Sequence, residues 1–267
     1  MTFTKELVAA GGFAFAMTLA IMLALWLVSL RLKDVSFIDA WWGPGFAAIA
    51  IFVFAFAGAK GFRPVLVLAC VCLWGLRLGF HLFTRWRASR EEDARYAAMR
   101  RKAGSGFALQ SLLMVFGLQA VLMWIVSLPV QAAIVQPARG GLGPIEICGL
   151  ALFLAGLVFE TIGDAQLRRF KADPANHGKV LATGIWAWTR HPNYFGDACM
   201  WWGLFVLAAA NQGNLWTVIG PVVMTWLLVS VSGKSLLEHG LRKSKPGYAE
   251  YIATTSGFIP WPPKRKN

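Results

Sequence analysis

The chain has 267 residues, of which 57% are apolar and only 15% are charged, and it includes 13 tryptophans and 19 phenylalanines. This composition is too apolar for a water-soluble domain of this length and favours a protein whose solvent is the lipid bilayer. The net charge of +13 is explained by the topology signals of membrane proteins and by attraction to anionic lipid, so it does not by itself indicate nucleic-acid binding, which we do not expect.

Seven apolar runs have about the 20 residues that a hydrocarbon core of about 30 Å requires of a helix. The first is not followed by a small-residue cleavage site and a soluble domain, so we interpret it as a retained helix. No internal repeat is evident, and residues 1–267 are expected to form one membrane domain. The sequence thus predicts an all-α polytopic bundle with spans at residues 7–30, 36–59, 64–84, 107–135, 144–165, 194–211 and 214–236.

The basic residues are distributed unequally between the predicted connections. Most of the 26 lysines and arginines fall between spans one and two, three and four, or five and six, or in the tail. By the positive-inside rule these segments are cytoplasmic, which places the N-terminus outside and the C-terminus inside. We expect a multi-pass protein of a bacterial inner membrane.

Polar and charged side chains recur every three or four residues near the cytoplasmic ends of four spans, which puts each set on one helix face. Ionisable groups inside a membrane are costly unless they face a partner or a wet cavity, so each is a candidate site residue. The alternative is that they snorkel to the headgroups and merely end each helix. The four sets are Trp74, Arg77, His81 and Arg85; Glu160, Asp164 and Arg168; Asn193, Asp197 and Trp201; and Ser230, Lys234, Glu238 and Arg242.

If these faces line one cavity that opens to the cytoplasm, its charge indicates the ligand. Guanidinium groups suit phosphate, whereas carboxylates and an Asn suit ribose hydroxyls and an amide. The loop 166–193 adds Lys171, Lys179, Arg190 and His191. No G-x-G-x-x-G follows a strand, so a dinucleotide phosphate would be held by side chains and not by a Rossmann turn.

The second span begins with a carboxylate, Asp39, followed by Trp41, Trp42 and Gly43-Pro44-Gly45. A helix break inside a membrane is tolerated where freed backbone groups find partners or line a cavity. A carboxyl beside indoles in a low dielectric is a candidate acid/base, because its pKa would rise toward neutrality. The alternatives are that Asp39 is the N-cap of the second helix and that the tryptophans are belt or packing residues.

The segment from Thr183 to Asp197, which contains Arg190-His191-Pro-Asn193-Tyr, resembles the bacterial steroid 5-alpha-reductase-like membrane family, and so do the tail from Gly247 to Trp261 and the segment from Glu91 to Tyr96. The C-terminal half of that family shares the NADPH-binding region of steroid and sterol reductases. The resemblance implies that residues 144–267 bind cofactor and residues 1–106 bind substrate. Steroid reductases carry a Gln-Glu pair in the second helix and a Tyr in the third; this chain has Asp39, Trp42 and Trp74 at comparable places, and Glu238 where they have a histidine.

Position by position, the resemblance implies that Asp164, Arg168, Lys171 and Lys179 surround NADPH and that Asn193 and Asp197 contact its nicotinamide half or the adjoining ribose. Lys234 and Tyr251 would close the site, and Arg77 would stand where the family's helix holds a cofactor arginine. The remaining candidate cofactor residues are His81, Arg85, Arg190, His191 and Glu238.

The sequence supports three candidate functions. The first is an NADPH-dependent reductase of an activated double bond in a lipophilic, steroid-like or other lipid substrate, with Asp39, Trp42 and Trp74 as catalytic candidates. The second is an S-adenosylmethionine-dependent methyltransferase, because Arg190-His191-Pro-x-Tyr-x-Gly with Glu238 also resembles isoprenylcysteine and phospholipid methyltransferases. The third is a transporter or lipid-binding module, which the lack of an inverted repeat disfavours. No metal site is predicted, and we expect the four cysteines, Cys70, Cys72, Cys148 and Cys199, to be core residues.

Overall fold

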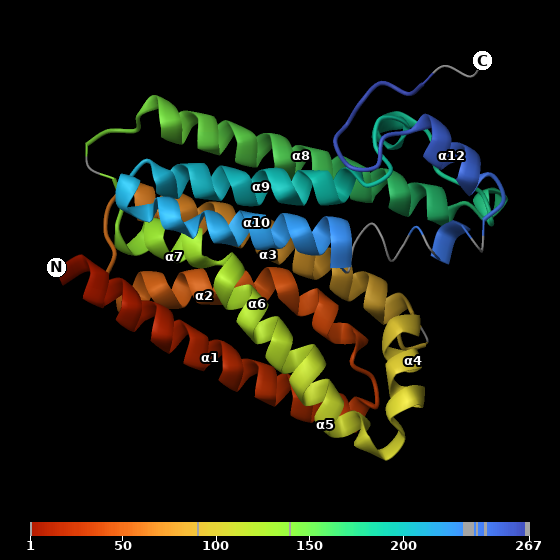
Figure 1. Cartoon of the computed structure of the whole chain (residues 1–267), viewed down its shortest axis with the longest axis horizontal. Coiled ribbons are helices and arrows are strands. Elements are labelled where there is room, and N and C mark those ends of the chain that lie inside the picture. The colour runs from red at the N-terminus through yellow and green to blue at the C-terminus, as the bar shows by residue number, and fades with distance from the viewer. Residues whose placement is uncertain are drawn as a thin grey trace. The chain divides into compact units, whose positions relative to one another are not determined.

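The computed structural model describes residues 2–89, 91–138, 140–231, 238, 240–242 and 245–264, with side chains from residue 5 onward. Within these residues the regular structure is helical, apart from one isolated bridge between Thr189 and Ser256. Figure 1 shows the long helices and the short helical segments that connect them. The predicted all-α class is confirmed.

Six helical stretches of the described chain are long and apolar enough to cross a membrane, which confirms a multi-pass membrane protein. The run predicted at 194–211 forms α9 (Pro192–Ala209) but is not among the six. Its first two turns include Asn193 and Asp197, which lower its mean hydropathy. The six stretches are Lys5–Leu32, Ser36–Phe56, Phe62–Ala88, Ala94–Val126, Pro144–Ala172 and Gln212–Val231.

Several helices extend beyond the apolar runs that predicted them. Helix α3 (Phe62–Ala88) ends with Arg85 and Arg87 in its last turn, and α8 (Pro144–Ala172) ends with Arg169 and Lys171. Cations are favourable near a helix C-terminus, because the backbone dipole is negative there. Apolarity therefore marked where the membrane segment ends, and the helix itself continues as a polar extension.

The chain forms two compact units, the first made of Met1–Gly141 with Ala208–Gly220 and the second of Leu142–Leu207 with Pro221–Asn267. In the first unit α2 and α3 pack closely at Gly43 and Gly75. A Cβ added to Gly43 would lie 2.1 Å from the Gly75 carbonyl oxygen, so only glycine fits. In chain order, the first helices of this unit are α1 (Thr2–Leu32), η1 (Ser36–Trp41), α2 (Trp42–Phe56) and α3.

The Gly43-Pro44-Gly45 sequence opens α2 and does not interrupt it. The change of backbone geometry comes just before it, where the 3₁₀ helix η1 ends at Trp41. Pro44 lies in the first turn of α2, where a missing backbone N–H costs no helical hydrogen bond. The predicted break is therefore a junction between two helix types.

The fourth predicted span, residues 107–135, is not one uninterrupted helix as expected. A π-helical segment, η3 (Leu112–Gly117), separates α5 (Phe107–Ser111) from α6 (Leu118–Val126). A turn at Ser127 then leads into α7 (Leu128–Val135), which has Pro129 near its start. Before this span lie α4 (Ala94–Ala103) and η2 (Gly104–Gly106), in a segment that the sequence had assigned to a connection.

In the second unit α8 and α9 lie side by side (Figure 1). They pack through glycines. A Cβ on Gly156 would lie 2.4 Å from the Gly196 carbonyl oxygen, and one on Gly149 would lie 2.9 Å from that of Gly203. Small residues let membrane helices approach closely, since dispersion contacts must replace the hydrophobic effect.

The short elements are η4 (Pro174–Asn176), η5 (Gly184–Ala187), η6 (Gln212–Val218, in the first unit), α10 (Ile219–Trp226, divided between the units), the π segment η7 (Leu227–Val231) and α12 (Tyr248–Thr254).

The cysteines are only partly core residues. Cys70 is buried, Cys72 and Cys199 are half-buried, and Cys148 is exposed on α8. The expectation that all four are core residues is wrong for Cys148, because its side chain on α8 is exposed and not packed in the interior.

Candidate functional site

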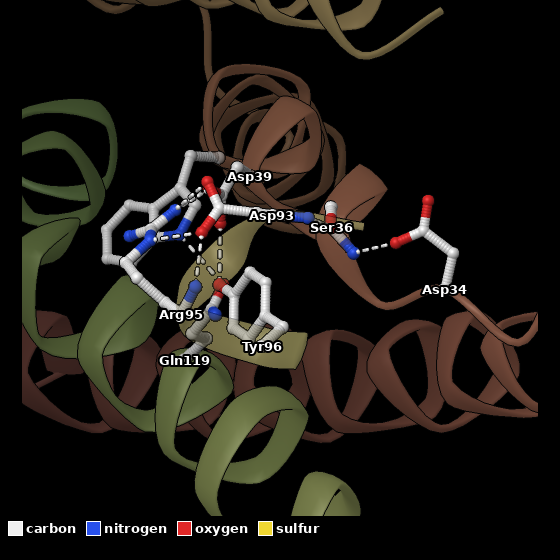
Figure 2. Close-up of polar contacts among 8 residues, drawn as sticks. Asp34, Ser36, Asp39, Asp93, Arg95, Tyr96 and Gln119 are labelled. Atoms are coloured by element: carbon white, nitrogen blue, oxygen red, sulfur yellow. Dashed lines mark hydrogen bonds and ion pairs between the residues drawn. The ribbon is translucent and has the colours of Figure 1, made fainter. Parts of the chain in front are cut away.

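Asp39 is the centre of a hydrogen-bonded network in the first unit (Figure 2). Its Oδ2 accepts a hydrogen bond of 2.6 Å from the Arg95 guanidinium, and its Oδ1 accepts one of 2.7 Å from the Tyr96 hydroxyl. Asp39 lies in η1, and no side-chain cap hydrogen bond precedes α2, so the N-cap interpretation is wrong. Its immediate partners are a cation and a phenol, and not the indoles that the sequence indicated.

The network continues from Tyr96 to a tryptophan. The Gln119 side chain hydrogen-bonds to the Tyr96 hydroxyl, and the Gln119 Oε1 accepts a bond of 2.8 Å from Trp42 Nε1. Tyr96 is buried, with 8% of its surface exposed, whereas 23% of the Asp39 side chain is exposed. The phenol is thus an interior group whose hydroxyl is oriented by one donor and one acceptor.

A second set of contacts holds the start of α4 against η1. Asp93 caps α4 by accepting from the Arg95 backbone N–H and the Arg95 Nε, at 2.9 and 2.8 Å. The Asp93 N–H donates to Ser36 Oγ at 2.7 Å, and the Ser36 N–H donates to Asp34. Burial alone would raise the pKa of Asp93, but its bonds to Arg95 outweigh this effect and lower the pKa. The carboxylate therefore stays ionised and keeps Arg95 facing Asp39.

Further contacts join the loop before η1 to the end of α3 and to α4. Glu92 accepts from the Val35 N–H at 3.1 Å and binds Arg100 through both carboxylate oxygens. Trp86 Nε1 donates to Asp34 at 2.8 Å. The loop between α1 and η1 is in this way joined to the end of α3 and to α4, which fixes the position of Asp39.

The other candidates of the first unit lie on α3. Trp74 is 1% exposed and packs against Phe46 with ring centroids 5.7 Å apart, and Phe46 lies at the same distance from Trp42. Trp74 is thus linked to Trp42 through tilted ring contacts with Phe46, which give it a packing role. Arg77 and His81 are half-buried and Arg85 is exposed.

In the second unit Asp164 and Asn193 are brought together, as the helix faces indicated. Asn193 Nδ2 donates to Asp164 Oδ1 at 3.4 Å, and Asp164 is 7% exposed. Asp197 follows one turn later on α9 and is also buried. The predicted phosphate ligands Arg168, Lys171 and Lys179 are exposed on the end of α8 and the following loop.

Arg190 and His191 lie against a carboxylate of the same chain. Arg190 Nε donates to Glu238 at 2.9 Å, and its Nη1 donates to the carbonyls of Ile252 and Thr255. His191 Nε2 lies 3.2 Å from the same Glu238 oxygen. These donors of Arg190 bind the chain itself, so this arginine anchors the tail.

Burial alone would raise the pKa of Glu238, but the hydrogen bonds and charges of Arg190 and His191 hold it below its ordinary value. Burial raises the pKa of Tyr248 to about 12 and that of Tyr251 well above its usual range. Tyr251, predicted to close the site, donates to the Trp186 carbonyl and joins α12 to the loop before α9. Lys234 lies outside the described residues.

Three residues of the network were missed from the sequence: Arg95, Tyr96 and Gln119. The signal for α4 was available, because Asp93 precedes a run of good helix formers and Gly104 follows it. No sequence period connects Tyr96 to Asp39, since they are 57 positions apart.

An all-helical bundle with several membrane spans and buried polar clusters defines a polytopic integral membrane protein. The family model described as "Protein of unknown function (DUF1295)" matches residues 25–255, and the chain belongs to this family. It is similar to "Uncharacterized protein C594.04c" of Schizosaccharomyces pombe, with 25% identity over 264 residues that span 88% of this chain and 75% of that protein. It is also 30% identical over 83 residues, or 31% of this chain and 28% of the other, to "Probable O-methyltransferase ustE" of Ustilaginoidea virens. No solved structure gives a significant match.

Proposed function

We propose that the protein is an NADPH-dependent membrane reductase that reduces an activated carbon–carbon double bond of a lipophilic substrate. The observation that carries the proposal is the Tyr96 hydroxyl, which lies between Asp39 Oδ1 and the Gln119 side chain, beside a carboxylate whose charge Arg95 balances. A buried phenol with an oriented proton suits a substrate carbonyl that gains negative charge during the reaction.

In this function NADPH, when bound, supplies the hydride that adds to the β-carbon of an α,β-unsaturated carbonyl compound. The electron pair of the double bond then moves to the carbonyl oxygen, and the Tyr96 hydroxyl turns its proton from Asp39 to that oxygen. The resulting enol then takes a proton from solvent at its α-carbon while its O–H proton returns to the Tyr96 oxygen, which gives the saturated product and restores the phenol. The Asp39 carboxylate, paired with Arg95, accepts the Tyr96 hydrogen bond and orients the phenol between turnovers.

The second unit offers groups that fit the cofactor. Arg168, Lys171 and Lys179 are exposed cations suited to phosphates, and Asp164 with Asn193 presents a carboxylate and an amide suited to ribose hydroxyls or the nicotinamide amide. Arg190 is not assigned to phosphate, because its Nε and Nη1 donors bind Glu238 and two tail carbonyls. The resemblance to steroid 5-alpha-reductase-like proteins supports the same cofactor residues.

The second candidate is an S-adenosylmethionine-dependent methyltransferase. The name of the relative from Ustilaginoidea virens favours it, and so does the joining of Arg190 and His191 to Glu238, since these residues carry the resemblance to isoprenylcysteine and phospholipid methyltransferases. S-adenosylmethionine has no phosphate, so this function gives no role to the exposed cations near the end of α8.

Ligand-induced stabilisation separates the two functions. The full chain in lipid nanodiscs is heated with NADPH, with NADH or with S-adenosylmethionine, since a ligand that binds only the folded state raises the melting temperature. If the protein is a reductase, NADPH should raise the melting temperature, and this rise should be smaller in Lys171→Gln. The control is Lys60→Gln, in the loop before α3, which should show the full rise. If only S-adenosylmethionine stabilised the protein, the reductase proposal would be rejected in favour of the methyltransferase.

Activity is then measured as the loss of NADPH absorbance with a panel of lipid enones, and products are identified by mass. An increase of two hydrogens in the product is expected.

We also propose that the cations of the second unit face the cytoplasm, as the distribution of basic residues favours. Reporter fusions at residues 60 and 175 should report opposite sides, and reports from the same side would contradict this orientation.

A further inference from the structure

The second unit exposes a cluster of large apolar side chains outside its membrane-spanning helices. Trp188 is 48% exposed, Ile259 is 64% exposed and Trp261 is 69% exposed. They belong to the loop before α9 and to the tail after α12, which we call the tail patch (residues 184–191 and 256–264). Exposed aromatic groups of this size are unfavourable in water and mark a surface that another phase or molecule covers.

The tail patch is held in one conformation by backbone and side-chain hydrogen bonds. The Arg190 N–H donates to the Ser256 carbonyl and the Trp261 N–H to the Trp188 carbonyl, both at 2.9 Å. The Thr189 hydroxyl donates to the Phe258 carbonyl at 2.8 Å. The two tryptophans are thus presented together on an ordered framework, as a preformed binding surface requires.

The position of the patch along α8 places it near the edge of the apolar layer. Trp186 Nε1 donates to the Gly163 carbonyl at 3.1 Å, and the Ile185 N–H donates to Gln166 at 3.2 Å. Gly163 precedes Arg168, the first cation in the polar end of α8, by about 7 Å of helix rise. The patch therefore lies beside the turns where α8 changes from apolar to cationic.

The charges around the patch are mainly positive. Exposed cations of these segments are Arg168, Arg169, Lys171, Lys179 and Lys264, and the exposed carboxylates are Asp173 and Glu250. Lys245 Nζ donates to the Lys179 carbonyl at 2.6 Å, which adds a further cation. An anionic membrane surface attracts each Lys or Arg that lies near it.

We propose that the tail patch is an interfacial membrane anchor, in which Trp188, Ile259 and Trp261 enter the headgroup boundary of the bilayer that the helices span while the surrounding cations bind anionic lipid phosphates. Tryptophan is enriched at this depth because its ring is apolar and its N–H needs a polar partner. The occupant is the lipid surface, not a second protein chain. This inference is independent of the reaction that the protein catalyses.

The test measures the depth of a spin label in nanodiscs. The full chain, with its four cysteines replaced by alanine, receives a label at Ile259→Cys or, as a control, at Ala175→Cys in η4 beyond the end of α8. At position 259 we expect accessibility to dissolved oxygen to exceed accessibility to a water-soluble nickel complex, and at position 175 we expect the reverse. The native chain and the cysteine-free chain are compared by thermal melting.

Four results would contradict the proposal or one of its parts. A label at 259 as open to nickel as that at 175 would place the patch in water, and a label closed to both reagents would indicate a protein partner. An identical depth at 259 in neutral and in anionic nanodiscs would exclude the lipid-phosphate part. In the double variant Trp188→Ser/Trp261→Ser, the label at 259 should move toward water while the melting temperature stays unchanged. An unchanged depth of the label would show that the indoles do not anchor the patch.

Discussion

The hydroxyl of Tyr96 donates a 2.7 Å hydrogen bond to Oδ1 of Asp39, and the guanidinium of Arg95, the preceding residue on α4, binds the other oxygen of the same carboxylate. One short helix thus supplies both partners of a carboxylate that lies in η1. Asp39 is therefore charge-balanced, and the group placed to give up a proton is the phenol.

Replacing Tyr96 by Phe tests this assignment. The ring keeps its packing, but the hydroxyl that Asp39 and Gln119 share is lost. If Tyr96 donates to the substrate carbonyl, kcat should fall by about 100- to 10,000-fold, while NADPH-induced stabilisation stays unchanged. Loss of the buried hydrogen bond should also cost about 1–3 kcal/mol of the free energy of unfolding.

The matched control is Tyr248→Phe, which removes the hydroxyl of another buried tyrosine, 3% exposed, in the second unit. It should keep full activity. Full activity in Tyr96→Phe, with the substrate that supports NADPH oxidation in the native chain, would remove this residue from the chemistry.

The ion pair between Arg95 and Asp39 should matter more for activity than for stability. The Arg95 side chain is 38% exposed, so solvent screens the pair, and Asp39→Asn should cost about 1 kcal/mol or less of unfolding free energy. The neutral amide is a weaker acceptor for the Tyr96 hydroxyl than the carboxylate, so the phenol should be less well oriented and turnover should fall. Chemical unfolding and NADPH oxidation are measured for both single variants and for Asp39→Asn/Arg95→Gln. A double variant as active as the native chain would refute the role of the Asp39 carboxylate in orienting Tyr96.

The sequence predicted the helices far better than it predicted the network. Apolar runs indicate spans because the bilayer demands them, and the faces of α8 and α9 correctly brought Asp164 near Asn193, since helix period determines which residues share a face. The turn at Ser127 and the π-helical η3 interrupt a run that is apolar throughout. Hydrophobicity carries no information about such changes of backbone geometry.

The pairing of Tyr96 with Asp39 has a different cause. It depends on how the segment between α3 and α4 turns back toward η1, and that turn is set by Asp93, Ser36, Asp34 and Glu92 acting together. Each of these residues alone resembles an ordinary connection residue. The environment of Arg190 could not be predicted for the same reason, because its partners come from Glu238 and from the tail.

The close approach of α2 and α3 gives a stability prediction. In Gly43→Ala the new methyl would lie 2.1 Å from the Gly75 carbonyl oxygen, so the helices must separate, at a cost of about 1–3 kcal/mol. Gly12→Ala is the control, because no atom lies within 4 Å of its added Cβ and alanine favours a helix. Thermal melting in nanodiscs should fall for Gly43→Ala and stay equal or rise for Gly12→Ala. Equal melting of the two variants would contradict the packing.

Acid should release the tail from the rest of the second unit. The folded-state pKa of Glu238 lies below its ordinary value of 4.5, so the unfolded or released state binds a proton more readily than the folded state. The stabilisation by Glu238 is therefore fully present above pH 4.5 and is lost as the pH falls through the lowered folded-state pKa. Its loss leaves the Arg190 guanidinium buried without its carboxylate.

Hydrogen exchange of the α12 amides reports this release directly. Protection should be constant from neutral pH to about pH 5, after correction for the intrinsic exchange rate, and should fall in more acidic buffer. Glu238→Gln should lower protection already at neutral pH and abolish the acid-dependent fall. Glu250→Gln, which alters an exposed carboxylate of α12, should retain the native profile. If Glu238→Gln also retained it, Arg190 would hold the tail through the carbonyls of Ile252 and Thr255 alone.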